Sequence, residues 1–166
     1  VLLNQDGTTQ NDLGTGYPLD SYDQSVIDNL KLVLTGWYVP TTTASLAGET
    51  DTAVGNYLIP MPVHKNGSNQ EDRHSTGSKV LFTGFLPNQA GDGSPLTIPA
   101  SQPASQDLQQ TLDGIFNHPN VGPYLAKELI HSLVTSNPSP AYVERVAGFF
   151  NDNGLGQRGS VWAMVK

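Results

Sequence analysis

The sequence of 166 residues contains no cysteine, and only 14% of its residues are charged. The absence of cysteine excludes disulfides, thiol nucleophiles and thiolate zinc sites, so a metal site would need histidine and carboxylate ligands. Eight basic residues against fifteen acidic ones give a net charge of -7, which is unsuited to tracking the phosphates of a nucleic acid. No apolar run approaches the roughly 20 residues that span a bilayer. We therefore expect neither a nucleic-acid partner nor membrane insertion.

Uncharged polar side chains make up for the scarcity of charge. Ser, Thr, Asn and Gln account for 49 residues, a composition typical of the surfaces of secreted proteins. The first residue is Val1 rather than Met, and residues 160–166 read as a helix cut off after its first turns. Because the length suits one domain, we expect residues 1–166 to be a single domain or a piece of a longer chain.

Apolar residues recur at helical spacing in several stretches, which predicts a mainly α fold. A helical subdomain is expected over residues 106–151, with helices at 106–117, 121–134 and 140–151, and further helices near 23–34 and 160–166. The short connections after residue 105 favour three helices packed side by side. Within them we expect Leu125 and Leu129 in the core, and an apolar face on the first helix formed by Leu108, Leu112, Ile115 and Phe116.

The first hundred residues carry weaker signals. Gln5-Asp6-Gly7 is a turn sequence that predicts a short β-hairpin within residues 1–10. Residues 37–104 have no sustained helical period and are broken by prolines, so a long irregular loop region is expected there. Residues 80–85 are the best strand candidate in that region.

One charged cluster stands out in this charge-poor chain, the segment HKNGSNQEDRHSTGSK at residues 64–79. His74 between Arg73 and Lys79 could bind an anionic group, with Gly77 allowing a positive φ or a close backbone approach. A solvated loop with incidental charges is the plainer interpretation. His64 and His74 with a nearby carboxylate match no metal-site template, and no other motif indicates a cofactor, so we predict none. His118, before Pro119, reads as a helix-end residue whose cationic ring would meet the negative pole of the helix dipole.

Several motifs together resemble a known bacterial family. LTGW at 34–37, RHSTGSK at 73–79, the long segment at 118–154 that begins HPNVGPYLAKELIHSL, and the following GQRGSVWAMV are similar to the carboxyl-terminal half of the family catalogued as domain of unknown function 1800. The resemblance covers about residues 22–166. It implies a largely helical, exported protein in the periplasm or outside the cell. Residues 1–166 would then be the carboxyl-terminal fragment of this larger protein, with its amino-terminal half as a partner.

The same resemblance singles out a His-x-x-Gly-x-Lys element, which falls here on His74, Gly77 and Lys79. Many members of the family carry Asp after the His, where this chain has Ser75. A role that needs a carboxylate at that position is therefore not expected. The family implies no reaction, and fold-level analogy would not supply one.

Three functions remain open from the sequence, and whether the chain is an enzyme stays undecided. The first is a non-catalytic domain for envelope assembly or polysaccharide binding, in which Trp37 and neighbouring aromatic rings stack on sugars. The second is a hydrolase on an anionic or glycan substrate, with His74 as acid or base and Lys79 or Arg73 holding the anion. The third is a scaffold that completes the core of a larger chain.

Overall fold

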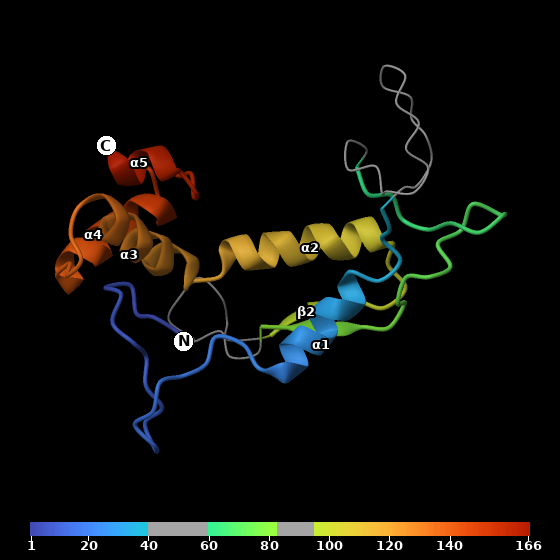
Figure 1. Ribbon diagram of the computed structural model, residues 1–166, viewed down its shortest axis with the longest axis horizontal. Coiled ribbons are helices and arrows are strands. Elements are labelled where there is room, and N and C mark those ends of the chain that lie inside the picture. The colour runs from blue at the N-terminus through green and yellow to red at the C-terminus, as the bar shows by residue number, and fades with distance from the viewer. Residues whose placement is uncertain (40–59, 83–94) are drawn as a thin grey trace. The chain divides into compact units, whose positions relative to one another are not determined.

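The computed structural model describes residues 1–39, 60–82 and 95–166 (Figure 1). The elements are α1 (Gln24–Val33), β1 (Lys79–Leu81), β2 (Leu96–Ile98), α2 (Ala104–Asn117), α3 (Val121–Leu133), α4 (Pro140–Asn151) and α5 (Val161–Val165). The fold is mainly α with a two-stranded antiparallel sheet, which confirms the predicted fold class. Each expected helix is present, with ends displaced by at most two residues.

The chain divides into two compact units. Unit 1 comprises Val1–Gln24, Phe82–Leu96 and Leu112–Lys166, and unit 2 comprises Ser25–Leu81 and Thr97–Thr111. The first turns of α2 belong to unit 2 and its remaining residues to unit 1.

The core of unit 1 is apolar and lies where α3 packs on α4 and α4 packs on α5 (Figure 1). Its buried residues are Ala126, Ile130, Val143, Val146, Ala147, Phe150 and Met164. The residues that α4 contributes to this core, Val143, Val146, Ala147 and Phe150, recur at helical spacing. On α3 the buried stripe is turned by one residue from the prediction, so that Leu125 and Leu129 are only partly buried against the cluster. Small residues on the inner face of α3, Gly122 and Ala126, let its backbone approach α4 closely.

The expected apolar face of α2 was wrong. Leu112, Ile115 and Phe116 are exposed, and the residues that α2 buries are Ala104, Asp107 and Thr111. Among the described residues α2 is not one of the packed helix pairs, so the expected row of three helices is reduced to α3 and α4 with the short α5. The physical reason is that α2 buries a carboxylate against charged partners in unit 2, which are described below.

The amino-terminal residues form the predicted hairpin in minimal form. Leu3 and Thr9 make a single antiparallel bridge, and Gly7 closes the turn at a φ of 75°. A Cβ at Gly7 would lie 2.7 Å from Val143 Cγ1, so only glycine lets the turn rest on α4. The backbone N–H of Leu3 also donates to Asn120 Oδ1 at 2.6 Å, which ties the hairpin to the start of α3.

The carboxyl end of α2 is capped by an arginine rather than by the expected histidine. Arg158 donates from Nε to the carbonyl of Phe116 at 3.2 Å and from Nη2 to the carbonyl of His118 at 3.1 Å. A cation therefore satisfies terminal carbonyls at the negative end of the helix dipole. His118 instead accepts a hydrogen bond on Nδ1 from the N–H of Asn120 at 3.1 Å, which requires an unprotonated nitrogen.

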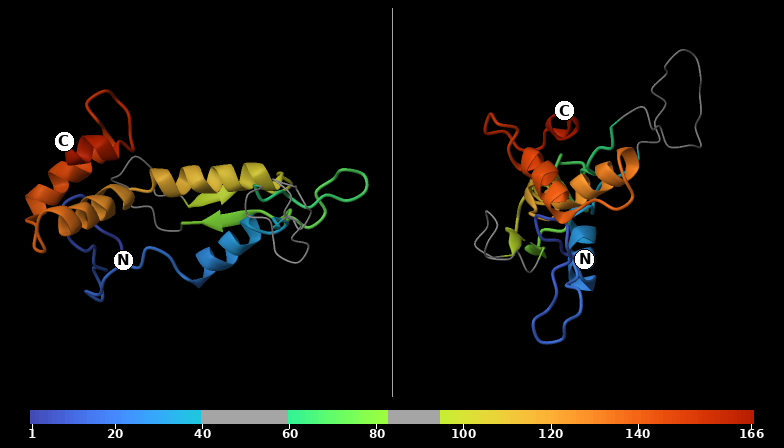
Figure 2. Two further views of the ribbon diagram at one scale, coloured as in Figure 1. Left: turned by 45° about the horizontal axis from the view of Figure 1, so that its top comes forward. Right: turned by 90° about the vertical axis from the view of Figure 1, so that its left-hand side faces the viewer.

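Unit 2 combines α1, the first turns of α2 and the small sheet. Strands β1 and β2 lie side by side (Figure 2), and Leu81 and Ile98 are fully buried on them. The strand expected within residues 80–85 is present as β1, although residues 83–85 lie outside the described residues. A second hairpin spans residues 64–72, with a bridge between Lys65 and Glu71.

Candidate functional site

Three charged or ionisable side chains are buried together in unit 2, and we call them the charge cluster. They are His74 from the loop before β1, Lys79 at the start of β1, and Asp107 in the first turn of α2. Their side chains are 2%, 1% and 0% exposed, respectively. Ionisable groups at this depth are stable only when they are paired and hydrogen-bonded.

All three N–H donors of Lys79 form hydrogen bonds within the protein. Its Nζ donates to Asp107 Oδ2 at 2.6 Å, to the carbonyl of Ser75 at 2.7 Å and to the carbonyl of Gly77 at 3.0 Å. Since an ammonium has three N–H donors, none is left for a ligand in this arrangement. The ammonium therefore fixes the turn of residues 75–79 to α2.

His74 is held on both sides of its ring. Nδ1 lies 3.0 Å from the carbonyl oxygen of Thr35, and Nε2 lies 3.0 Å from Asp107 Oδ2. Both ring nitrogens are therefore engaged by partners within the protein. Neither nitrogen is then free to exchange a proton with a bound molecule.

The segment that follows α1, Thr35 and Gly36, lies close to the backbone of His74 and Ser75. Thr35 Oγ1 accepts from the N–H of Ser75 at 2.8 Å and donates to the carbonyl of Leu32 at 2.6 Å. Gly36 has a φ of 85°, and a Cβ there would lie 3.1 Å from the backbone nitrogen of His74. A residue with a side chain at position 36 would therefore have a strained backbone, and its Cβ would crowd the backbone of His74.

A polar groove of about 430 Å³ lies beside the charge cluster in unit 2. It is lined by Lys65, Asn69, Gln70, Glu71, His74, Thr76, Ser101, Gln102 and Pro103. Two contacts shape its walls: Glu71 Oε2 accepts from the N–H of Ala104 at 2.8 Å, and the N–H of Ser101 donates to the carbonyl of Thr76 at 2.8 Å. The first contact joins the hairpin of residues 64–72 to the start of α2. The second contact joins the loop that carries His74 to the segment that precedes α2.

A second histidine–carboxylate pair lies on the same hairpin but does not line the groove. His64 Nδ1 is 2.6 Å from Asp72 Oδ1, and the ring of Tyr38 meets the His64 ring edge-on at 6.0 Å. This hydrogen bond and the charge of His64 hold the pKa of Asp72 below its ordinary value. The hydrogen bond orients the His64 ring toward Asp72.

The residues proposed from the sequence are only partly brought together. His74 and Lys79 meet on Asp107, whereas Arg73 is exposed and does not line the groove. The positive φ expected for Gly77 is absent, and a Cβ there would meet nothing within 4 Å. Trp37 is half-buried and bridges Val63, and its buried Nε1 has no hydrogen-bond partner in the part of the chain that the structure describes. The ligand-binding and catalytic roles of these residues stay predictions.

Sequence reasoning missed Asp107, Gly36 and the amide-bearing walls of the groove. The one available signal for Asp107 was its position on α2 in line with Ala104 and Thr111, at helical spacing. Metal binding by His64 and His74 gains no support, because the described residues contain no group of three or more His, Asp or Glu placed to hold a metal ion. In the same part of the chain, no helix has the length and apolar character needed to cross a bilayer.

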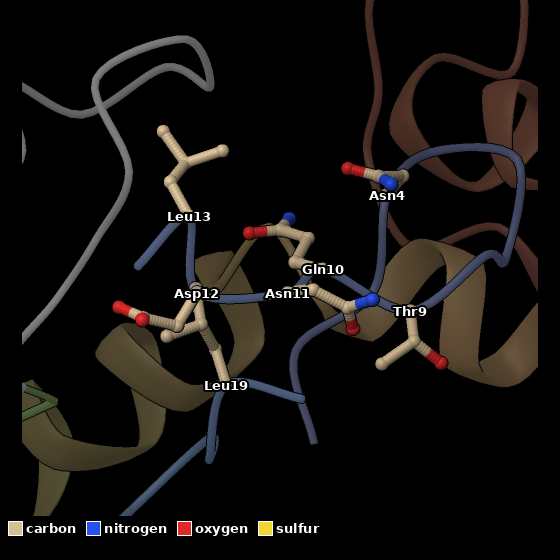
Figure 3. Close-up of a pocket in the computed structure, with 7 residues that line it drawn as sticks. All are labelled: Asn4, Thr9, Gln10, Asn11, Asp12, Leu13 and Leu19. Carbon is tan, nitrogen blue, oxygen red and sulfur yellow. The ribbon is translucent and has the colours of Figure 1, made fainter. Parts of the chain in front are cut away.

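A second hollow, of about 500 Å³, lies in the amino-terminal part of unit 1 (Figure 3). It is lined by the residues that Figure 3 labels, Asn4, Thr9, Gln10, Asn11, Asp12, Leu13 and Leu19. Gln10 donates from Nε2 to the carbonyl of Leu3 at 2.8 Å, so part of this lining serves the hairpin itself.

The fold and the site define a mainly helical protein with a buried charge cluster beside a polar groove. Residues 12–166 match the family model of the protein of unknown function DUF1800, and the chain belongs to this family. The match contains the whole charge cluster and the whole polar groove, but it leaves out four of the seven residues that line the hollow in Figure 3. No curated protein and no solved structure matches the chain.

Proposed function

We propose that the chain is a non-catalytic domain of an exported protein and that it binds a segment of polysaccharide in the polar groove. The observation that carries this proposal is the groove's lining, in which amide and hydroxyl side chains outnumber charged ones. Sugars are recognised by such hydrogen-bonding groups in a cleft of this size. The proposed location is the periplasm or the outside of the cell, where envelope polysaccharides lie. The family resemblance adds an amino-terminal half of the same protein as a second proposed partner.

The geometry of the charge cluster favours binding over hydrolysis. A general acid or base needs a nitrogen or oxygen within hydrogen-bond reach of the substrate. Both nitrogens of His74 face Thr35 and Asp107, and Lys79 has no spare donor. The cluster therefore supports a structural role beneath the groove, where it holds the wall residues in place.

An exposed aromatic ring near the hairpin offers a further contact for a sugar. Tyr38 is 44% exposed and is held edge-on against His64 at the base of the hairpin of residues 64–72. Trp37 is less available, because it is half-buried. Tyr57, a third aromatic residue near the predicted loop, lies outside the described residues.

Nuclear magnetic resonance titration of the full 166-residue chain with soluble oligosaccharides tests this proposal. We expect amide shifts to move at groove residues such as Asn69, Thr76 and Ser101, with no release of reducing ends on prolonged incubation. Shifts confined to the hollow in Figure 3, or cleavage of the sugar, would contradict the proposal. Fractionation of the native cells tests the location, and recovery in the cytoplasm would contradict export.

A further inference from the structure

The balance of charge in the polar groove bears on which sugars it can hold. Among its lining side chains, Lys65 and Glu71 carry opposite charges, and Glu71 is already bonded to the N–H of Ala104. The imidazole of His74 is also in use within the charge cluster. The remaining polar side chains are uncharged amides and hydroxyls.

Lys79 and Arg73, which the sequence suggested as binders of an anionic group, do not line the groove. Lys79 is 1% exposed and gives its three donors to Ser75, Gly77 and Asp107. Arg73 does not line the groove. Recognition of carboxylate or phosphate groups relies on available guanidinium or ammonium donors. Among the lining residues only Lys65 supplies one, with Glu71 opposite it in the hairpin bridge.

Gln102 presents an unmet hydrogen-bonding group in the groove wall. Its Oε1 is buried, and within the described residues it has no hydrogen-bond partner. A buried acceptor without a donor is unfavourable. A ligand that donates a hydrogen bond to this acceptor removes that cost, which favours binding. The terminal torsion of a glutamine is soft, so this amide can turn toward the groove while the rest of the residue stays fixed.

The backbone around Gln102 is anchored on both sides. Ser101 has a φ of 65° and donates its N–H to the carbonyl of Thr76, while Pro103 accepts from the N–H groups of Gln106 and Asp107 at the start of α2. Because the main chain is held, the adjustable part of this wall is the Gln102 side chain.

We propose that the groove takes an uncharged, hydroxyl-rich glycan segment and that Gln102 is the residue that recognises it. In this arrangement Gln102 Oε1 accepts a hydrogen from a sugar hydroxyl. The inference rests on the proposed function, and it adds that the ligand class is neutral rather than anionic.

Calorimetric titration of the full chain with matched pairs of oligosaccharides tests the ligand class. Galactotetraose and tetragalacturonic acid differ only in the carboxylate at carbon 6, and mannose and mannuronate oligomers form a second pair. We expect at least one neutral member to bind roughly tenfold or more tightly than its acidic counterpart. Equal or tighter binding of the acids overturns the inference while leaving polysaccharide binding intact. If neither member of any pair binds, both the inference and the proposed function fail.

Replacing one amide tests the role of Gln102. Gln102→Met keeps the length of the side chain and removes both of its hydrogen-bonding groups, whereas Gln106→Met makes the same change at an exposed position of α2 that does not line the groove. We expect Gln102→Met to weaken binding of the neutral oligosaccharide roughly fivefold to tenfold and Gln106→Met to leave it unchanged. Melting temperature should be unchanged or higher for Gln102→Met, because the unpaired buried oxygen is gone. If both variants bind equally well, Gln102 does not recognise the ligand.

Discussion

The two units of the chain are stabilised by different chemistry. Unit 1 buries aliphatic and aromatic side chains contributed by α3, α4 and α5, whereas unit 2 buries His74, Lys79 and Asp107 around one carboxylate oxygen. An apolar core gains stability from area and tolerates changes of shape. A buried charge cluster depends on every partner being present, because one unpaired charge costs more than the pair contributes. Single substitutions should therefore affect the two units in different ways.

The largest effect is expected at Asp107, the shared acceptor of the charge cluster. Asp107→Asn leaves the buried ammonium of Lys79 without a counter-charge, so the free energy of unfolding should fall by about 3 to 5 kcal/mol. Urea denaturation measures this loss. Asp20→Asn, at an exposed position before α1, is the control and should change stability by no more than about 0.5 kcal/mol. Equal effects of the two substitutions would show that the cluster does not stabilise unit 2.

The apolar core should respond according to burial. Ile130 is 2% exposed, so Ile130→Ala should lower the free energy of unfolding by about 2 to 5 kcal/mol. Leu129 is only partly buried, and Leu129→Ala should cost less, about 1 to 2 kcal/mol. A larger loss at Leu129 than at Ile130, measured by the same denaturation, would contradict the orientation of α3.

Substitutions of Gly36 and Gly77 test the structure against the expectation drawn from the His-x-x-Gly-x-Lys motif. Gly36→Ala places a side chain at a φ of 85° beside the backbone of His74 and should cost about 1 to 2 kcal/mol. Gly77→Ala meets open space and should be nearly neutral. Thermal melting of both variants checks this order, and greater damage at Gly77 would support the motif-based expectation instead.

The smallest effect concerns the pH dependence of unit 1. Burial, with a smaller contribution from the charge of Arg158, holds the pKa of His118 below its ordinary value of 6.5. As the pH falls through 6.5, the unfolded chain takes up a proton at His118 before the folded chain does, so folded stability decreases with acidification. His118→Gln should flatten this decline between pH 7.5 and 5.5, while His131→Gln at an exposed position should not. An unchanged slope in His118→Gln would contradict the assignment.

The helices and the family could be predicted from the sequence, because both depend on local patterns. The inner face of α4 follows directly from the spacing of its apolar residues. The face of α2 could not be predicted, because four apolar residues outweighed the single Asp107 in any count of periodicity. Its partners, His74 and Lys79, are 33 and 28 residues away in the chain, and no local rule joins them.

The sequence drew attention to the segment that contains His74 and Lys79, and the ligand-binding role of that segment stays a prediction. The charged segment at residues 64–79 singled out His74 and Lys79. Whether such a side chain can bind a ligand depends on its exposure, which the sequence does not give. With its ammonium buried, Lys79 is committed to the protein interior. The groove walls carry common amide and hydroxyl residues, which are spread over two separate segments and have no motif.

The unfolding free energy of Lys79→Met tests the central claim most directly, because methionine keeps the stem of the side chain and removes its charge. We predict a loss of about 3 to 5 kcal/mol, since Asp107 then loses its ammonium partner, while the folded protein keeps its affinity for a neutral oligosaccharide. Stability within about 0.5 kcal/mol of the unsubstituted chain, together with lost binding of an anionic glycan, would contradict the account and show that Lys79 serves a ligand.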